Sequence, residues 1–185
     1  DLAAEMNNKG QIFATDNDAR RLKPIHERLE RAGARNVQVK TPTARAARVD
    51  GLEGKMDLVL VDAPCTGTGT WRRNPDAKWR MRPGSLEERM KEQVAVLETA
   101  APCVKPGGRL VYITCSLLDE ENGARISEFL ARHKGFALVP PGQLAVDAGL
   151  PQVQSHLDVT GQGLLLTPKR TNTDGFFIAA MIRTA

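Results

Sequence analysis

The residues Leu58 to Val61 are four consecutive aliphatic side chains, and a turn rich in proline, glycine and threonine follows them at 63–70. A short unbroken apolar run is typical of a strand that is buried on both faces, as in a parallel sheet covered by helices. Ligands bind beyond the carboxyl ends of such strands. Asp62 and Cys65, which follow the run, are therefore predicted to lie at a functional site.

A second β-rich run, residues 109–114, ends in another cysteine, Cys115. Neighbouring parallel strands end at the same edge of a sheet, so the two thiols are predicted to share one pocket. Taken alone, Cys65 has a second interpretation as a buried structural thiol beside a turn-forming Asp, because cysteine is among the most buried residue types. The second thiol favours a functional site over that interpretation.

The order of the apolar segments predicts an α/β fold. Ser85 and Glu88 form a capping box that is expected to open a long helix. The Lys-Pro-Gly-Gly segment at 105–108 is expected to end that helix and to turn into the next strand. The segment 140–174 is rich in Gly, Pro and Gln and contains one short apolar run. Strands are expected at 11–15, 36–40, 58–61, 109–114, 136–139 and 175–182.

With 185 residues, 41% of them hydrophobic, the chain can bury the core of one domain, either alone or with an appendage. No apolar run approaches the roughly 20 residues that a bilayer-spanning helix needs. The first residues show neither the basic nor the apolar region of a signal peptide. The sequence does not begin with Met, so the chain is expected to be a fragment. A formal net charge of +4 favours a polyanionic partner only where the positive charge is clustered.

The three cysteines, Cys65, Cys103 and Cys115, are an odd number and include no C-x-x-C pair. This spacing argues against a zinc site and against a disulfide framework, and we expect no metal. Free thiols fit a reducing cytoplasm. The three histidines lie in polar segments, and no role is assigned to them.

Positive charge is clustered in the segment 71–82, which contains both tryptophans of the chain, four arginines and one lysine against one aspartate. Aromatic rings interleaved with guanidinium groups suit stacking on unpaired bases and contact with phosphates. The alternative is a tryptophan that anchors the core beside a solvated basic face, because Trp is usually largely buried. The candidate RNA-binding residues are Trp71, Arg72, Arg73, Lys78, Trp79 and Arg80.

Asp16 follows the predicted strand 11–15. In doubly wound sheets an acidic residue at such a strand end binds ribose hydroxyls. The alternative is that Asp16 or Asp18 caps the next helix, whose regular part is expected to begin near Pro24. Both interpretations can hold, since two aspartates are available.

Four motifs together resemble the RNA cytosine-carbon-5 methyltransferases, in particular their Sun (RsmB-like) rRNA methyltransferase branch. They are Asp-Ala-Pro-Cys-Thr-Gly-Thr-Gly at 62–69, Lys-Pro-Gly-Gly at 105–108, Thr-Cys-Ser at 114–116 with Glu-Glu-Asn at 120–122, and Thr-Asp-Gly-Phe-Phe at 173–177. The resemblance covers the whole chain. It implies that residues 1–185 are a methyltransferase catalytic domain truncated at its amino end, with a Rossmann-like, S-adenosylmethionine-dependent methyltransferase fold. That fold is a seven-stranded sheet with a reversed last strand.

The resemblance also implies the chemistry. Carbon 5 of cytosine is a poor nucleophile until a thiolate adds to carbon 6, so covalent catalysis divides one hard step into easier ones. Cys115 is then the attacking thiol, and Cys65 assists release of the product. Asp62 hydrogen-bonds the base near N3 and lies near the cofactor with Pro64, while Asp16 holds the ribose. DNA cytosine methylases attack from a Pro-Cys motif instead, and the second thiol moves the assignment to RNA.

Two departures from the family pattern stand out. The family has an acidic residue that contacts adenine where this chain has Thr41, Pro42 and Thr43. The glycine-rich cofactor loop, the first central strand and an amino-terminal RNA-binding domain are expected before Asp1. We therefore expect this chain alone to bind S-adenosylmethionine weakly or not at all, and to fill the gap by self-association or with a borrowed strand. The competing protein classes are a non-catalytic RNA-binding module and a thiol redox protein. The expected substrate of the methyltransferase is rRNA, most simply 16S rRNA, and the alternative is tRNA.

Overall fold

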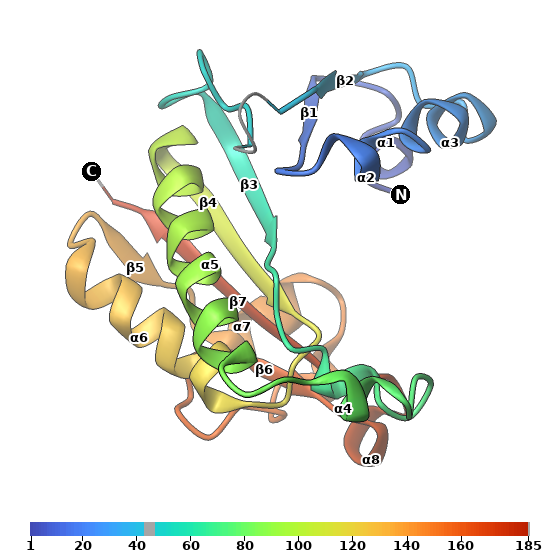
Figure 1. Ribbon diagram of the computed structural model, residues 1–185. Coiled ribbons are helices and arrows are strands. Elements are labelled where there is room, and N and C mark those ends of the chain that lie inside the picture. The colour runs from blue at the N-terminus through green and yellow to red at the C-terminus, as the bar shows by residue number, and fades with distance from the viewer. Residues whose placement is uncertain (43–46, 185) are drawn as a thin grey trace. The chain divides into compact units, whose positions relative to one another are not determined.

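The computed structural model describes residues 1–42 and 47–184. The chain forms two compact units, Asp1–Leu52 and Glu53–Ala185, and each unit has a sheet of its own (Figure 1). Among the described residues, no helix combines the length and the apolar character needed to cross a membrane.

The first unit is built on two parallel strands whose register pairs Ile12 with Val37. Asp18 caps the first helix after β1, since its carboxylate accepts a hydrogen bond from the Arg20 backbone N–H. Pro24 then separates this helix from the next one, as predicted. The elements are α1 (Leu2–Glu5), β1 (Ile12–Thr15), α2 (Ala19–Leu22), α3 (Ile25–Arg31) and β2 (Val37–Lys40).

The second unit contains a five-stranded sheet in the order β3-β4-β7-β5, with β6 also paired to β7. Strands β3 and β4 are parallel, whereas β7 runs antiparallel to β4, β5 and β6, so the predicted reversed last strand is confirmed. The elements are β3 (Met56–Asp62), α4 (Ala77–Arg80), α5 (Ser85–Ala100), β4 (Val104–Thr114), α6 (Gly123–Arg132), β5 (Phe136–Leu138), α7 (Pro141–Asp147), β6 (Leu164–Leu166), α8 (Pro168–Thr171) and β7 (Phe176–Arg183).

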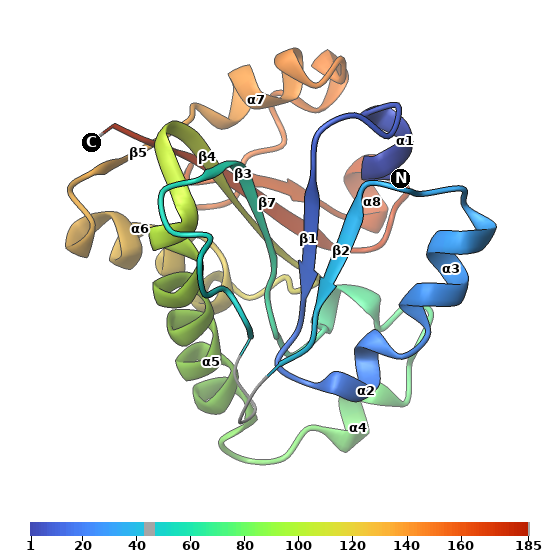
Figure 2. The ribbon, with the colours of Figure 1, turned by 90° about the horizontal axis from the view of Figure 1, so that it is seen from above.

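Helices cover both faces of the five-stranded sheet. α5 and α6 lie together on one face, and α7 lies on the other (Figure 2). The core between sheet and helices contains large side chains with no exposed surface, and full burial of such a side chain contributes about 1.5–3 kcal/mol. The predicted inward positions Ile126 and Phe129 of α6 belong to it. Other members are Leu97, Leu110, Tyr112, Phe177 and Met181.

The prediction that Leu58 to Val61 is buried on both faces is wrong. Val61 is 5% exposed and packs in the core with Val59, on the side that α5 contacts. Leu58 and Leu60 point to the opposite side, because successive side chains of a strand alternate, and they are 47% and 45% exposed. Strand β3 is also the last strand at its end of the five-stranded sheet.

Two predicted boundaries of α5 also differ. Gly84, at φ +83°, is the N-cap, and the Ser85 hydroxyl accepts a hydrogen bond from the Arg82 backbone N–H instead of forming a capping box. The segment 105–108 is not a turn before the strand but a bulge within β4, because Met56 pairs with Val104 and the next pair is Leu58 with Arg109. A side chain cannot fit at Gly108, where a Cβ would lie 2.8 Å from the Met56 carbonyl oxygen.

The segment 140–174, expected to contain only one apolar run, forms α7, β6 and α8. The run 164–166 is the strand β6, which pairs with β7. Helix α7 begins at Pro141 in its first turn, a position where proline is tolerated because the missing N–H would have no helical partner.

Candidate active site

The loops after β3 and β4 bring two free thiols into contact. The Sγ atoms of Cys65 and Cys115 are 3.4 Å apart, and both side chains are half-buried. The expectation that the two strand ends bring these thiols together is therefore confirmed. Their contact follows from the parallel pairing of β3 with β4, in which Asp62 lies opposite Ile113.

The contact makes the two thiols chemically different. A hydrogen bond from Cys65 lowers the pKa of Cys115 to about 7, although partial burial and the charge of Asp62 act in the opposite direction. The same hydrogen bond, together with burial, raises the pKa of Cys65 well above its ordinary value. Cys115 is therefore the sulfur that ionises near neutral pH, while Cys65 keeps its proton. The thiolate is the nucleophilic form of cysteine.

Close backbone contacts hold the Cys65 loop against its neighbours. The Gly69 N–H donates a hydrogen bond to the Cys115 carbonyl oxygen (2.9 Å), and the Gly175 N–H donates one to the Gly69 carbonyl oxygen (2.8 Å). A Cβ at Gly69 would lie 2.3 Å from the carbonyl oxygen of Gly175. Only glycine therefore allows this approach between the loop and the residue before β7.

The Cys115 loop is fixed by a buried network of hydroxyl and amide groups. The Thr114 hydroxyl donates to Asn122 Oδ1 (2.5 Å), and Asn122 Nδ2 donates to the Ser116 carbonyl oxygen (2.9 Å). The Ser116 hydroxyl contacts Thr68 Oγ1 (3.1 Å), which joins this network to the Cys65 loop. The sequence had shown these residues as parts of motifs but had assigned no role to Thr68 or Asn122. The sequence showed only that Thr68 and Asn122 are polar residues within motifs. Their structural role follows from their position in the fold, because polar groups that become buried require hydrogen-bond partners.

Asp62 and Pro64 lie at the carboxyl end of β3, as predicted. Asp62 is exposed and close enough to Cys115 to influence its ionisation. The Pro64 carbonyl oxygen accepts a hydrogen bond from the Gln93 side chain (2.9 Å). No cluster of three or more potential metal ligands occurs among residues 1–42 and 47–184.

Asp16 lies at the carboxyl end of β1 in the first unit. Its Oδ1 accepts a hydrogen bond from the Asp18 backbone N–H (2.8 Å), so Asp18 is the helix cap and Asp16 is not. A cavity of about 300 Å³ beside the end of β2 is lined by residues that include no carboxylate. They are Ala19, Leu22, Lys23, His26, Val39 and Thr41. Thr43, one of the three residues found where the family has its adenine-contacting acidic residue, lies outside the described residues.

The basic segment around α4 is solvent-exposed. Trp79 is 80% exposed, with the Lys78 ammonium 4.8 Å from its ring centroid, so the alternative of a core anchor is wrong for Trp79. Trp71 is half-buried. Arg73 forms an ion pair with Asp174 (2.5 Å), a residue with only 10% of its side chain exposed.

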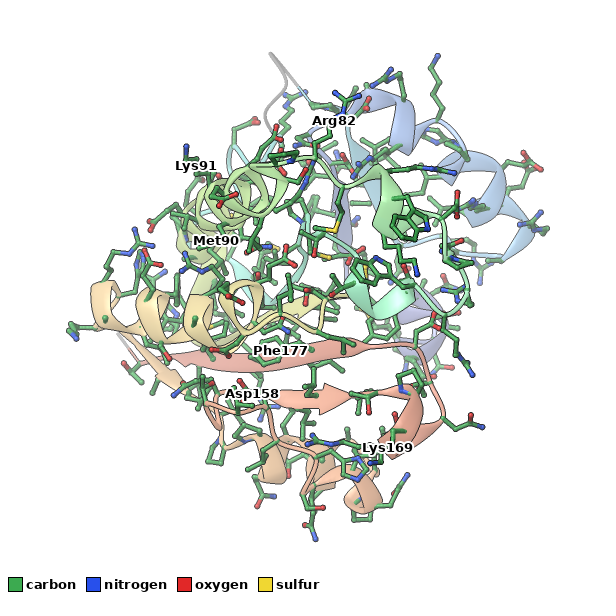
Figure 3. All side chains as sticks on the ribbon, turned by 60° about the horizontal axis from the view of Figure 1, so that its bottom comes forward. Arg82, Met90, Lys91, Asp158, Lys169 and Phe177 are labelled. Carbon is green, nitrogen blue, oxygen red and sulfur yellow. The ribbon has the colours of Figure 1, made fainter. Side chains whose placement is uncertain are left out.

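The remaining basic residues of the segment are exposed: Arg72 has no ion-pair partner among the described residues, and Arg80 pairs with Asp76. Arg82 and Lys91 are on the α5 side of β7, and Lys169 is on the α8 side (Figure 3). Lys78, Arg72 and Arg80 therefore remain accessible to a polyanion.

A sheet with a parallel β3–β4 pair, a reversed last strand and helices on both faces is the Rossmann-like fold of S-adenosylmethionine-dependent methyltransferases. The family model described as 16S rRNA methyltransferase RsmB/F matches residues 1–182, and the chain belongs to that family.

Relatives and solved structures agree with this assignment. The ribosomal RNA small subunit methyltransferase B of Salmonella arizonae is 39% identical over 175 residues, which are 95% of this chain and 37% of the relative. A probable enzyme of the same name from Bacillus subtilis is 34% identical over 97% of this chain and 39% of its own length. The crystal structure of NSun6 from Pyrococcus horikoshii with SFG has a TM-score of 0.74 and 28% identity, and the match covers all of this chain and 44% of that one. The chain thus spans a little over a third of the length of these curated relatives.

Proposed function

We propose that this chain is the catalytic part of an enzyme that methylates carbon 5 of a cytosine in RNA through a covalent cysteine adduct. The observation that carries the proposal is the contact of 3.4 Å between the Cys65 and Cys115 sulfurs, with the proton held by Cys65. Such a pair makes a thiolate of Cys115 accessible near neutral pH beside the thiol of Cys65. Both groups are required by a reaction that first adds a sulfur to the base and then expels it.

The proposed steps begin with the thiolate of Cys115. Its sulfur adds to carbon 6 of the cytosine, a carbon–sulfur bond forms, and the electron pair of the 5,6 double bond becomes available at carbon 5. Asp62, exposed at the end of β3, hydrogen-bonds the base near N3 and favours the protonated, more electrophilic ring. S-adenosylmethionine, when bound, supplies an electrophilic methyl group to carbon 5. The carbon-5 proton then passes to water, its electron pair re-forms the 5,6 double bond, and the carbon–sulfur bond breaks as the Cys65 thiol donates a hydrogen bond to the departing thiolate of Cys115.

The residues proposed to contact the cofactor are Asp16, Asp62 and Pro64. In the first unit Asp16 has a carboxylate oxygen that is not used to cap α2, and ribose hydroxyls are its expected partners. In the second unit Asp62 and Pro64 lie at the carboxyl end of a parallel strand, where such folds bind ligands. The cavity beside β2 offers the apolar side chains of Leu22 and Val39 to an adenine ring but no carboxylate.

The proposed substrate is ribosomal RNA, most simply 16S rRNA, because the matching family and the curated relatives are named for it. A cytosine must leave its stack to reach a thiol in a protein pocket. The exposed ring of Trp79 and its basic neighbours, Arg72, Lys78 and Arg80, suit contact with unpaired bases and phosphates. We place the reaction in the cytoplasm, and tRNA is the alternative substrate.

The roles of the thiols are tested in the complete protein that carries this chain. Cys115→Ala should abolish methylation, whereas Cys65→Ala should accumulate a covalent protein–RNA adduct on denaturing gels with labelled RNA. A Cys65→Ala variant that is inactive without an adduct, beside an active Cys115→Ala variant, would show that the roles are reversed. Mapping 5-methylcytosine in rRNA and tRNA with and without the gene identifies the substrate.

A further inference from the structure

Glu121 is a carboxylate with no exposed surface, in the short turn Asp119–Glu121 between β4 and α6. Burial of a carboxylate costs several kcal/mol unless other groups compensate for the lost water. No ion pair involves Glu121 within residues 1–42 and 47–184. Hydrogen bonds must therefore replace the water that the Glu121 carboxylate loses on burial. The donors of these bonds identify the segments that the carboxylate fixes in place.

The side-chain hydrogen bonds of Glu121 go to Thr66, in the loop that carries Cys65, and to Gln93 of α5. Its Oε1 accepts hydrogen bonds from the Thr66 backbone N–H (2.8 Å) and from Gln93 Nε2 (3.1 Å), and its Oε2 accepts one from the Thr66 hydroxyl (2.5 Å). Gln93, also without exposed surface, donates in addition to the Pro64 carbonyl oxygen (2.9 Å). The residues directly before and after Cys65 are thus both held, one by the carboxylate itself and one through Gln93.

Glu121 is in turn fixed to the strand that ends in the other thiol. Its carbonyl oxygen accepts a hydrogen bond from the buried hydroxyl of Tyr112 in β4 (2.7 Å). The next residue, Asn122, bonds to Thr114 and to Ser116 on either side of Cys115. Asn122 therefore bonds to the residues beside Cys115, and Glu121 bonds to the loop that carries Cys65.

We propose that Glu121 is a positioning residue that sets the Cys65 sulfur against the Cys115 sulfur. The inference rests on the proposed function, because it assigns to this geometry the step in which Cys65 assists release of the Cys115 adduct. Without the carboxylate, the Thr66 N–H and hydroxyl lose their partner inside the protein, and the loop relaxes toward water. Addition of the Cys115 sulfur to the base continues, whereas release slows.

The test compares variants of the complete protein. Glu121→Ala should lower multiple-turnover methylation by about 10- to 100-fold, the range expected when a reacting group moves by about 1 Å, and should accumulate the protein–RNA adduct as Cys65→Ala does. Glu121→Gln should restore most of the turnover, because its amide oxygen can accept the bonds from Thr66 and Gln93 while the Thr66 hydroxyl turns to accept. Glu120→Ala is the matched control, since Glu120 is exposed and its backbone carbonyl, which the substitution keeps, accepts the hydrogen bond from Arg125; it should leave both readouts unchanged.

A second readout needs no RNA. Dibromobimane bridges two neighbouring thiols and fluoresces when both of its arms have reacted, so it reports the distance between the Cys65 and Cys115 sulfurs. Bridging should be lost in Glu121→Ala and kept in Glu120→Ala. Where Glu121→Ala is unfolded by circular dichroism, Thr66→Val takes its place, since it removes one of the three bonds and should reduce bridging and slow adduct release.

Normal bridging and turnover in a folded Glu121→Ala variant would overturn the inference. So would an equal loss of turnover and of adduct formation with bridging intact, which would mean that the carboxylate only stabilises the fold. The proposed function fails separately, if Cys65→Ala forms no adduct. Loss of bridging in Glu121→Ala would in that case still show that Glu121 positions Cys65.

Discussion

Replacement of Cys65 by alanine should raise the pKa of Cys115. In the native pair, the hydrogen bond from Cys65 is the largest cause that brings the pKa of Cys115 down to about 7. Alanine removes that donor and leaves the opposing influences of burial and of the Asp62 charge in place. The thiolate of Cys115 therefore becomes harder to form, and its reactivity at neutral pH falls.

The size of the change follows from the strength of the lost bond. A hydrogen bond to a charged group contributes about 1.5–3 kcal/mol, which corresponds to about 1–2 pKa units. An S–H group is a weak donor and this site is half open to water, so the lower end, about one unit, is expected. A pKa that rises from about 7 to about 8 reduces the thiolate fraction at pH 7 about fivefold, and alkylation at pH 7 slows by less than this factor, because a thiolate of higher pKa is the better nucleophile.

The assay is the rate of iodoacetamide alkylation between about pH 5.5 and pH 9.5, with each modified cysteine located by peptide mass spectrometry. It uses the 185-residue chain and requires neither RNA nor cofactor. Cys103, which is 2% exposed, should stay unmodified in the folded protein and reports unfolding. A Cys103→Ala variant is the matched control and should keep the native midpoint. An unchanged midpoint for Cys115 in Cys65→Ala, or faster alkylation of Cys65 than of Cys115 in the native chain, would refute the reasoning.

The remaining predictions concern pH, RNA and assembly. Between about pH 7 and pH 9 the native thiol pair binds one proton and the two unfolded thiols bind two, so the free energy of unfolding should rise with pH. Above about pH 9 the free energy of unfolding should fall, because the native pair keeps the Cys65 proton that the unfolded chain has lost. Urea unfolding across this range should show that maximum, and the double variant Cys65→Ala, Cys115→Ala should lack it. Arg72→Gln should reduce the slope of log affinity for single-stranded RNA against log salt by about 0.7, whereas Arg73→Gln should change it less, because Arg73 is held by Asp174; equal effects would contradict this difference. The chain alone should self-associate through β3, whose outer edge pairs with no strand among the described residues and whose apolar side is half-exposed. A monomer by light scattering at about 10–100 μM would contradict that expectation.

The sequence predicted the strands and the meeting of the thiols because both depend on local patterns. The apolar runs before Asp62 and Cys115 identified two parallel strands, and parallel strands end at one edge. The exposure of Leu58 and Leu60 could not be predicted in this way, since an unbroken apolar run has the same pattern whether one face of its strand is covered or both. The position of Ser85 likewise depended on Gly84, whose left-handed conformation begins α5 one residue earlier.

The part of the site that was missed is the part made by contacts between distant segments. Glu121 and Gln93 are polar residues in or near helices, where a charged or amide side chain usually faces water. Their burial arises because the turn after β4 and the middle of α5 both meet the loop that carries Cys65. The periodicity of apolar residues in the sequence does not predict that these distant segments come into contact. Glu121 was a polar residue within a motif, without an assigned role, whereas Gln93 lies outside the motifs.

The most direct test of the account is to identify the cysteine that bonds to RNA. The complete protein with Cys65→Ala is incubated with its RNA substrate and the methyl donor, denatured, and digested with protease and nuclease. Mass spectrometry then locates the modified cysteine. The account predicts one nucleotide-bearing peptide, which contains Cys115 between Thr114 and Ser116. The same modification on any other cysteine, or active methylation by a Cys115→Ala variant, would contradict it.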